Sequence, residues 1–105
     1  MRRGEIWWAD LPAPIGRRPV VLLSRDKVYQ VRSSATVAVV TRTIRNIPVE
    51  VPLGPAQGLP TTCVVNLDDI LTVPRSLLVS RIVALDNQQM ALVDKAIRFA
   101  LDIKH

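Results

Sequence analysis

Two adjacent arginines at the start of an apolar segment are the first candidates for chemistry. Arg17 and Arg18 stand directly before Pro19, and a proline biases the residue before it toward an extended backbone. Arg18 is therefore expected at the mouth of a strand, where a rigid element can hold a guanidinium accurately against a phosphate. The alternative is a charge at a strand end that only keeps a sheet edge soluble, and the spacing alone favours this plainer interpretation.

Hydroxyl and carboxylate groups supply further candidates. Thr41 is followed by Arg42 and Thr43, and a hydroxyl beside an arginine forms a pair of donors to phosphate oxygens. Asp68 and Asp69 are adjacent carboxylates, but neighbours in a strand point to opposite faces. They make a poor site for two metal ions, and from the residues alone we interpret them as part of a solvated turn.

The neighbouring tryptophans Trp7 and Trp8 have two interpretations. In a strand, one of them enters the core while the other faces outward. The outward ring could stack on an unpaired base. Burial of that ring against a helix or in a subunit interface is the interpretation that ranks higher on the sequence alone.

The composition excludes several classes of protein. The chain has one cysteine, Cys63, and one histidine, His105, so an internal disulfide and a cysteine-only zinc site are excluded. No apolar run approaches the roughly 20 residues of a membrane span, and the first residues lack the apolar core of a secretory signal. We expect a cytoplasmic protein that uses no metal and no cofactor.

The charge is concentrated in one half of the chain. Residues 1–50 hold nine basic and four acidic residues, which accounts for the whole net charge of +5. Eight of the nine basic residues are arginine, whose planar fork suits phosphate oxygens and base edges. A nucleic-acid surface and a solvated basic face without a ligand are equally compatible with this charge.

Short strands followed by one helix must position these side chains. Strands are expected over residues 5–11, 19–24, 35–43, 48–53, 62–67 and 77–84, with a further short strand near 68–73. Residues 30–34 are expected to form a loop. Asp86 is a helix cap with Gln89 three positions later, and one apolar stripe then predicts a helix of about four turns. That stripe consists of Met90, Val93, Ile97 and Leu101. We therefore expect one domain, residues 1–105, that is mainly β with a C-terminal helix closing a small, curved sheet or partly open barrel.

The order of these motifs resembles the MazF/PemK toxin family, and the match covers nearly the whole chain. Its most specific parts are the opening block of residues 3–7 (Arg-Gly-Glu-Ile-Trp) and the block of residues 18–22 (Arg-Pro-Val-Val-Leu). Gly16, Thr41, the Asn-Leu-Asp-Asp-Ile run of residues 66–70 and Arg75 follow the same order. The resemblance implies an SH3-like small barrel, the fold shared by CcdB and MazF toxins.

The resemblance also implies an activity and partners. It implies a metal-independent endoribonuclease, an mRNA interferase, that cleaves single-stranded RNA at short specific sequences. The 2′-OH attacks the adjacent phosphate and leaves a 2′,3′-cyclic phosphate and a 5′-OH. It further implies a homodimer, with RNA lying across a groove at the dimer interface, and a cognate antitoxin that neutralises the toxin.

Carried over residue by residue, the resemblance assigns roles to the candidates. Arg18 and Thr41 fall on the active-site arginine and threonine of the family. Asp68 and Asp69 fall on positions that contact RNA bases. Three further residues beside these positions, Arg17, Arg42 and Thr43, are expected to bind substrate as well. Arg18 would then stabilise the charge of the transition state, and Thr41 would donate to the same phosphate.

Departures from the family pattern leave alternatives open. Gly16 runs directly into Arg17, so the first loop is short and basic, and Arg42 and Leu71 differ from the residue types of many relatives. The target sequence is therefore not carried over, and a structured tRNA is a variant substrate beside mRNA. One alternative is a CcdB-like DNA gyrase poison that acts through C-terminal residues, here 102–105. The other is a non-catalytic barrel that binds RNA or an antitoxin.

Overall fold

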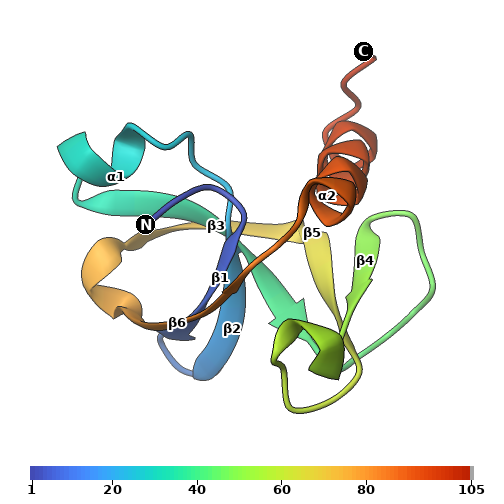
Figure 1. The fold of residues 1–105 in the computed structure, drawn as a ribbon, viewed down its shortest axis with the longest axis horizontal. Coiled ribbons are helices and arrows are strands. Elements are labelled where there is room, and N and C mark those ends of the chain that lie inside the picture. Colours follow the sequence, from blue (N-terminus) through green and yellow to red (C-terminus); the bar gives the residue numbers. More distant parts are fainter. Residues whose placement is uncertain (105) are drawn as a thin grey trace.

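One curled antiparallel sheet organises the chain in a computed structural model, which describes residues 1–104 (Figure 1). Within that range the strands are β1 (Glu5–Asp10), β2 (Arg17–Leu22), β3 (Ser34–Thr41), β4 (Glu50–Leu53), β5 (Cys63–Pro74) and β6 (Leu78–Ala84). The helices are α1 (Val28–Val31) and α2 (Asn87–Ala100), with single 3-10 turns at Pro55–Gln57 and Arg75–Leu77. The strand order is β4-β5-β3-β2-β1-β6, so the expected mainly β fold with a C-terminal helix is confirmed.

The sheet buries apolar side chains on both of its faces because it curls. β3 lies between β2 and β5, and its residues Val37, Ala38, Val39 and Val40 are all buried. Alternate residues join different clusters, since Ala38 and Val40 pack in one group of core residues and Val37 and Val39 in another. Fully burying a valine contributes roughly 1.5–3 kcal/mol, so this strand is a rigid support for the residues at its ends.

Helix α2 begins where the sequence predicts. The Asp86 carboxylate accepts the backbone N–H of Gln89 at 2.7 Å, and the Gln89 side chain accepts the backbone N–H of Asp86 at 3.2 Å. Val93 is completely buried, and α2 lies beside β5 and β4 (Figure 1). The end of the apolar stripe differs from the prediction, because Leu101 lies beyond the helix and is 57% exposed.

Two segments differ from their predicted structure. Residues 63–74 form one continuous strand, β5, where the sequence predicts a strand, a turn and a second short strand. Ala38 pairs with Ile70 and Val40 with Val65, so residues 66–69 form a bulge opposite Val39. The four-residue helix α1 was not expected, because local propensity in so short a segment is weak. Val28 and Tyr29 are buried in it, so tertiary packing holds this turn in place.

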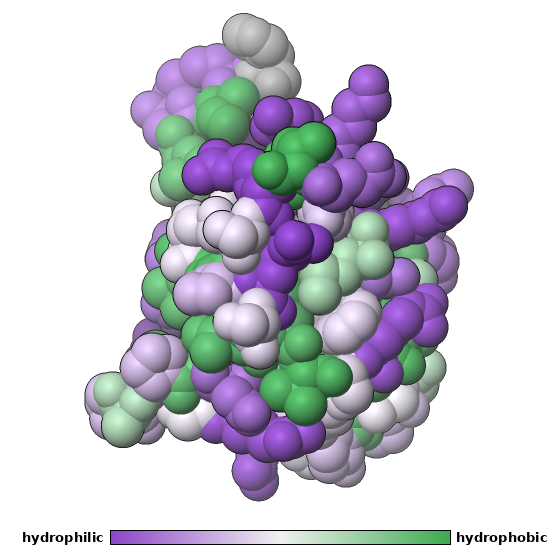
Figure 2. All heavy atoms as spheres, turned by 90° about the vertical axis from the view of Figure 1, so that its left-hand side faces the viewer, coloured by the Kyte–Doolittle hydropathy of each residue, from purple (hydrophilic) through white to green (hydrophobic). Residues whose placement is uncertain are grey.

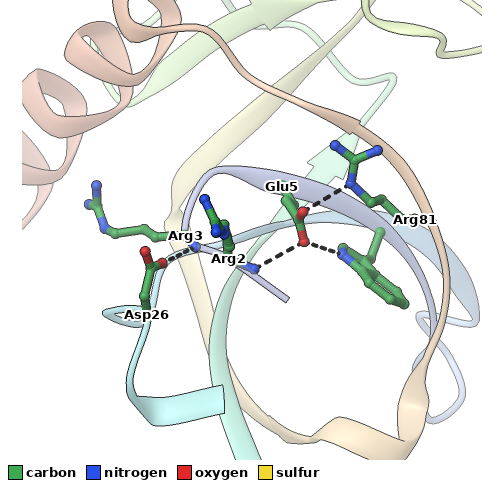
Figure 3. Close-up of polar contacts among 6 residues, drawn as sticks. Arg2, Arg3, Glu5, Asp26 and Arg81 are labelled. Carbon is green, nitrogen blue, oxygen red and sulfur yellow. Dashed lines mark hydrogen bonds and ion pairs between the residues drawn. The ribbon is translucent and has the colours of Figure 1, made fainter. Parts of the chain in front are cut away.

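Polar contacts tie the N-terminal residues to the sheet (Figure 3). The Glu5 carboxylate accepts hydrogen bonds from the Trp7 indole N–H at 3.0 Å, the Arg81 guanidinium at 2.9 Å and the backbone N–H of Arg2 at 3.0 Å. The neighbouring Arg3 donates its backbone N–H to Asp26 at 2.7 Å. Trp7 is thus the structural member of the tryptophan pair.

The Glu5 contacts predict a pH-dependent stability. Burial alone would raise the pKa of Glu5, but the hydrogen bonds from Trp7, Arg2 and Arg81 outweigh it and bring the pKa below its ordinary value of 4.5. A pKa lowered by folding stabilises the protein above the unfolded pKa, and the stabilisation is lost as pH falls through the folded pKa. Glu5→Gln should cost about 2 kcal/mol at neutral pH and flatten the fall of the unfolding free energy below about pH 5. Urea unfolding at a series of pH values measures both effects, and parallel curves for the two proteins would contradict the assignment.

Charged and apolar side chains alternate on the face that carries α1 and β6. Figure 2 shows hydrophobic residues dispersed among hydrophilic ones there. Val31 of α1 and Val79 of β6 are large apolar residues that are 76% and 47% exposed. Scattered apolar residues of this kind are normal on a protein surface.

Candidate functional site

An open groove of about 760 Å³ crosses the ends of β2, β3 and β5. Its walls come from four regions of the chain: Trp8 and Ile15; Arg17, Arg18 and Pro19; Val40, Thr41, Arg42 and Thr43; Leu59, Pro60, Thr61 and Cys63. Five of the seven residues predicted to act on a substrate therefore lie in one concave surface. Among residues 1–104, no acidic side chain lines it, so the groove is suited to an anionic ligand.

Strand pairing brings Arg18 and Thr41 together although 22 residues separate them in sequence. Val20 pairs with Val39 at the end of the antiparallel β2–β3 ladder. Arg18 and Thr41 each lie two residues beyond this pair, and both side chains line the groove. Both side chains can therefore reach one phosphate group.

The hydrogen-bonding state of these two side chains leaves their donors available. Within residues 1–104, the half-buried Arg18 guanidinium makes no hydrogen bond and no ion pair. The Thr41 hydroxyl oxygen accepts the backbone N–H of Thr43 at 3.2 Å, so its own proton is free to point elsewhere. An unpaired guanidinium beside an oriented hydroxyl is the donor set that a phosphoryl group requires.

The other basic residues surround this pair. Arg17 lies 3.6 Å from the Asp10 carboxylate, and its guanidinium carbon is 5.5 Å from the centre of the Trp8 ring. Arg42 and Thr43 are exposed in the loop after β3. Consecutive residues of a strand point to opposite faces of the sheet. Arg17 and Arg18 are consecutive and both line the groove, because the groove lies at the end of β2, where side chains from both faces can reach it.

The structure does not bring Asp68 and Asp69 into the groove. Both are exposed in the β5 bulge. Thr41 pairs with Val64, which is four residues from Asp68 along β5, a separation of roughly 13 Å at 3.3 Å per residue. Their interpretation as a turn is wrong, because they belong to a continuous strand, but their exposure to solvent agrees with it. The backbone N–H of Asp68 donates to the buried Asn66 side chain at 2.9 Å.

Several groove residues were not predicted from the sequence. Leu59, Pro60 and Thr61 belong to a loop that folds back over the strand ends, and Cys63 begins β5. Burial raises the pKa of the Cys63 thiol, so it stays protonated at neutral pH. No short-range pattern marks these residues, because loop closure against a distant strand depends on the tertiary fold.

Residues 1–104 form neither a metal-binding cluster nor a membrane-spanning helix. No group of three or more His, Cys, Asp or Glu side chains is placed to hold a metal ion in this range. None of the helices formed there is long and apolar enough to cross a membrane. His105, the single histidine, lies outside the described residues.

Known proteins share both this sequence pattern and this fold. The family of PemK-like, MazF-like toxins of type II toxin–antitoxin systems matches residues 2–101. The protein named Probable endoribonuclease MazF5 from Mycobacterium tuberculosis is 42% identical over 101 residues, which cover 95% of this chain and 92% of that protein. Its name agrees with the enzyme class predicted from the sequence.

Two solved structures superimpose closely on the fold. The toxin MazF-mt6 of Mycobacterium tuberculosis has a TM-score of 0.89 at 33% identity, over 96% of this chain and 99% of that one. A mycobacterial endoribonuclease in complex with its cognate antitoxin has a TM-score of 0.88 at 26% identity, over 100% and 98%. The chain belongs to the PemK-like, MazF-like toxin family of type II toxin–antitoxin systems.

Proposed function

We propose that this MazF-like endoribonuclease cleaves single-stranded RNA in the groove, at short specific sequences and without a metal ion. The observation that carries the proposal is that Arg18, whose guanidinium is unpaired within residues 1–104, shares with Thr41 a groove that no acidic side chain of this range lines. A groove open at the strand ends admits a strand whose bases are unpaired and can be read on their edges. mRNA is the expected substrate, and tRNA is its variant.

In the proposed reaction the RNA supplies its own nucleophile. The 2′-oxygen attacks the adjacent phosphorus and gives up its proton, while the bond from phosphorus to the 5′-oxygen breaks and that oxygen takes up a proton. The products are a 2′,3′-cyclic phosphate and a 5′-OH. The step needs no oxidant, no reductant and no added water, so its atoms balance within the RNA chain.

Arg18 and Thr41 act on the phosphate as its charge grows. Negative charge builds on the non-bridging oxygens in the transition state, where charge-assisted hydrogen bonds from Arg18 become stronger. Arginine stays protonated at neutral pH, so Arg18 serves as an electrostatic group and not as a base. The Thr41 hydroxyl donates to the same phosphate and helps to hold the attacking and leaving oxygens in line.

The chemistry of the products gives the direct test of this function. Purified protein incubated with a long single-stranded RNA in EDTA should yield discrete fragments with 5′-OH ends, which polynucleotide kinase labels without prior phosphatase treatment. Chelation should leave the cleavage rate unchanged within about twofold, because Arg18 and the Thr41 hydroxyl, and not a metal ion, stabilise the negative charge of the transition state. Inhibition by EDTA that Mg²⁺ reverses would refute the metal-independent route, and 5′-phosphate ends would refute attack by the 2′-OH.

We further propose that the protein is a homodimer and that RNA lies across both subunits. Each subunit is a single domain, the protein is cytoplasmic, and a cognate antitoxin neutralises it. The mycobacterial relative solved with its antitoxin supports the last point. Exposed apolar side chains on and after α2 support self-association: Leu92, Phe99 and Leu101 are 49%, 62% and 57% exposed. A second subunit would also extend the RNA surface beyond the groove of one chain.

The dimer predicts a definite mass in solution. Light scattering at micromolar concentration should give about twice the chain mass of 11.7 kDa, since apolar patches on surfaces of soluble proteins mark association sites. A species of 11.7 kDa that retains full activity would contradict the shared RNA surface.

A further inference from the structure

Trp8 and Arg17 form a flat cationic surface on one wall of the groove. The Arg17 guanidinium carbon lies 5.5 Å from the centre of the Trp8 ring, within the range of a cation–π contact. The β1–β2 register produces this contact, because Asp10 pairs with Arg17 and Trp8 with Pro19. Trp8 is therefore the diagonal neighbour of Arg17 on the same face of the sheet.

The two rings of the tryptophan pair have different surroundings. The Trp7 indole N–H donates to Glu5, and the Trp7 ring packs against buried residues of the core. Trp8 is half-buried and lines the groove. Within residues 1–104, its indole N–H makes no hydrogen bond. Core packing and the hydrogen bond to Glu5 explain why a tryptophan stands at position 7. Within the same range, the exposed part of the Trp8 ring makes no such contact and faces the groove.

Asp10 lies beside the guanidinium of Arg17. Their closest atoms are 3.6 Å apart, and both side chains are more than half exposed. Such a pair contributes little to stability in water, so it leaves the guanidinium available to a ligand. Trp8, Arg17 and Arg18 all line the same groove, so the surface adjoins the phosphate position.

We propose that Trp8 and Arg17 form a nucleobase-binding subsite, on which one unpaired base next to the scissile phosphate stacks. This inference rests on the proposed cleavage of RNA and adds a positioning element to it. Aromatic and guanidinium planes stack on every base, at about 1–3 kcal/mol per base. A duplex keeps its bases stacked on one another, so the subsite selects single strands and places the sugar and phosphate against Arg18.

Tryptophan fluorescence tests the subsite. The chain has two tryptophans, so replacing one of them leaves the other as the single tryptophan. Trp7→Phe leaves Trp8 as the sole emitter, and Trp8→Phe leaves Trp7. The probes are a 2′-deoxyadenosine 12-mer, which lacks the nucleophile and stays intact, and the same phosphate backbone with abasic sites throughout. The Trp7→Phe protein should show saturable quenching by the first probe and little by the second. The Trp8→Phe protein should show little quenching by either.

Affinity gives a second readout that does not depend on emission. Arg17→Ala should weaken binding of the adenosine probe about 5- to 100-fold, the range that corresponds to one stacked base. Its affinity for the abasic probe should fall much less, because only phosphate contacts remain there. Equal losses for both probes, or equal quenching of Trp8 by both, would overturn the subsite and leave Arg17 as a phosphate contact.

The two proposals fail in different ways. If RNA is cleaved in an Arg18-dependent manner while Trp8 does not respond to bases, only the subsite is refuted. If RNA stays intact and neither probe binds, the proposed function is refuted and the subsite with it.

Discussion

Arg18→Ala should lower kcat for RNA cleavage by about 10³-fold or more, the scale seen for arginines that stabilise a transferring phosphoryl group. The structure supplies the reason: within residues 1–104 the guanidinium makes no ion pair, and it lines the same groove as Thr41. Its donors are therefore held ready for charge that develops only in the transition state. Single-turnover cleavage of a fluorescent single-stranded RNA measures the effect.

Matched variants separate charge from chemistry in this experiment. Arg98→Ala removes the same charge from the exposed side of α2 and should leave the rate within about twofold, since distant exposed charges are screened by salt. Arg18→Lys keeps the charge but loses the planar fork, so its rate should fall between those of wild type and Arg18→Ala. Cleavage by folded Arg18→Ala at the wild-type rate would remove Arg18 from the mechanism. Intact RNA with the wild-type protein would instead favour the non-catalytic binding barrel or the gyrase poison.

Thr41→Val should reduce kcat about 10²-fold, the lower end of the loss from removing one donor to a developing oxyanion. Valine has nearly the same shape as threonine, and Thr41 ends a strand whose preceding residue Val40 is buried. The loss then reports the hydroxyl rather than the packing. The same single-turnover assay and the ratio of kcat to KM show whether the effect lies in the chemical step.

Two other threonine substitutions make the second prediction specific. Thr41→Ser restores a hydroxyl and should recover the rate to within about tenfold of wild type. Thr36→Val lies on the same strand, five residues away, where its hydroxyl is 3.4 Å from that of Thr72. It removes a hydroxyl from β3 outside the groove and should not change kcat. Equal losses for the valine substitutions at Thr36 and Thr41 would point to strand stability and not to phosphate binding.

Local patterns in the chain predicted most elements of the fold. The β-branched run of residues 35–43 predicted β3, and Asp86 with Gln89 predicted the start of α2, because these signals act between residues a few positions apart. Local sequence patterns were less informative for segments whose secondary structure depends on tertiary contacts. The helix α1 is too short for local propensity and is held by the burial of Val28 and Tyr29.

For the candidate site, too, the sequence indicated residue types, whereas the structure showed which of them lie together. The residue types around Arg18 and Thr41 are compatible with phosphate chemistry that needs no paired histidines, but only the family resemblance favoured that interpretation over a charge at a strand end. Composition and spacing left open whether these residues meet. Asp68 and Asp69 lie in the β5 bulge outside this groove, and the contact with RNA that the family resemblance implies for them stays a prediction.

Local sequence was enough to predict which residues prefer strands, where the last helix begins and which residue types are present for chemistry. Only the folded chain shows that Arg18 and Thr41 line one groove, that Leu59, Pro60 and Thr61 form part of its wall, and that Trp8 is the tryptophan that faces it. The difference lies in the range of the interactions. Propensity and capping depend on neighbours within a few residues, whereas register, curl and loop closure arise from pairings between distant strands, which no local window contains.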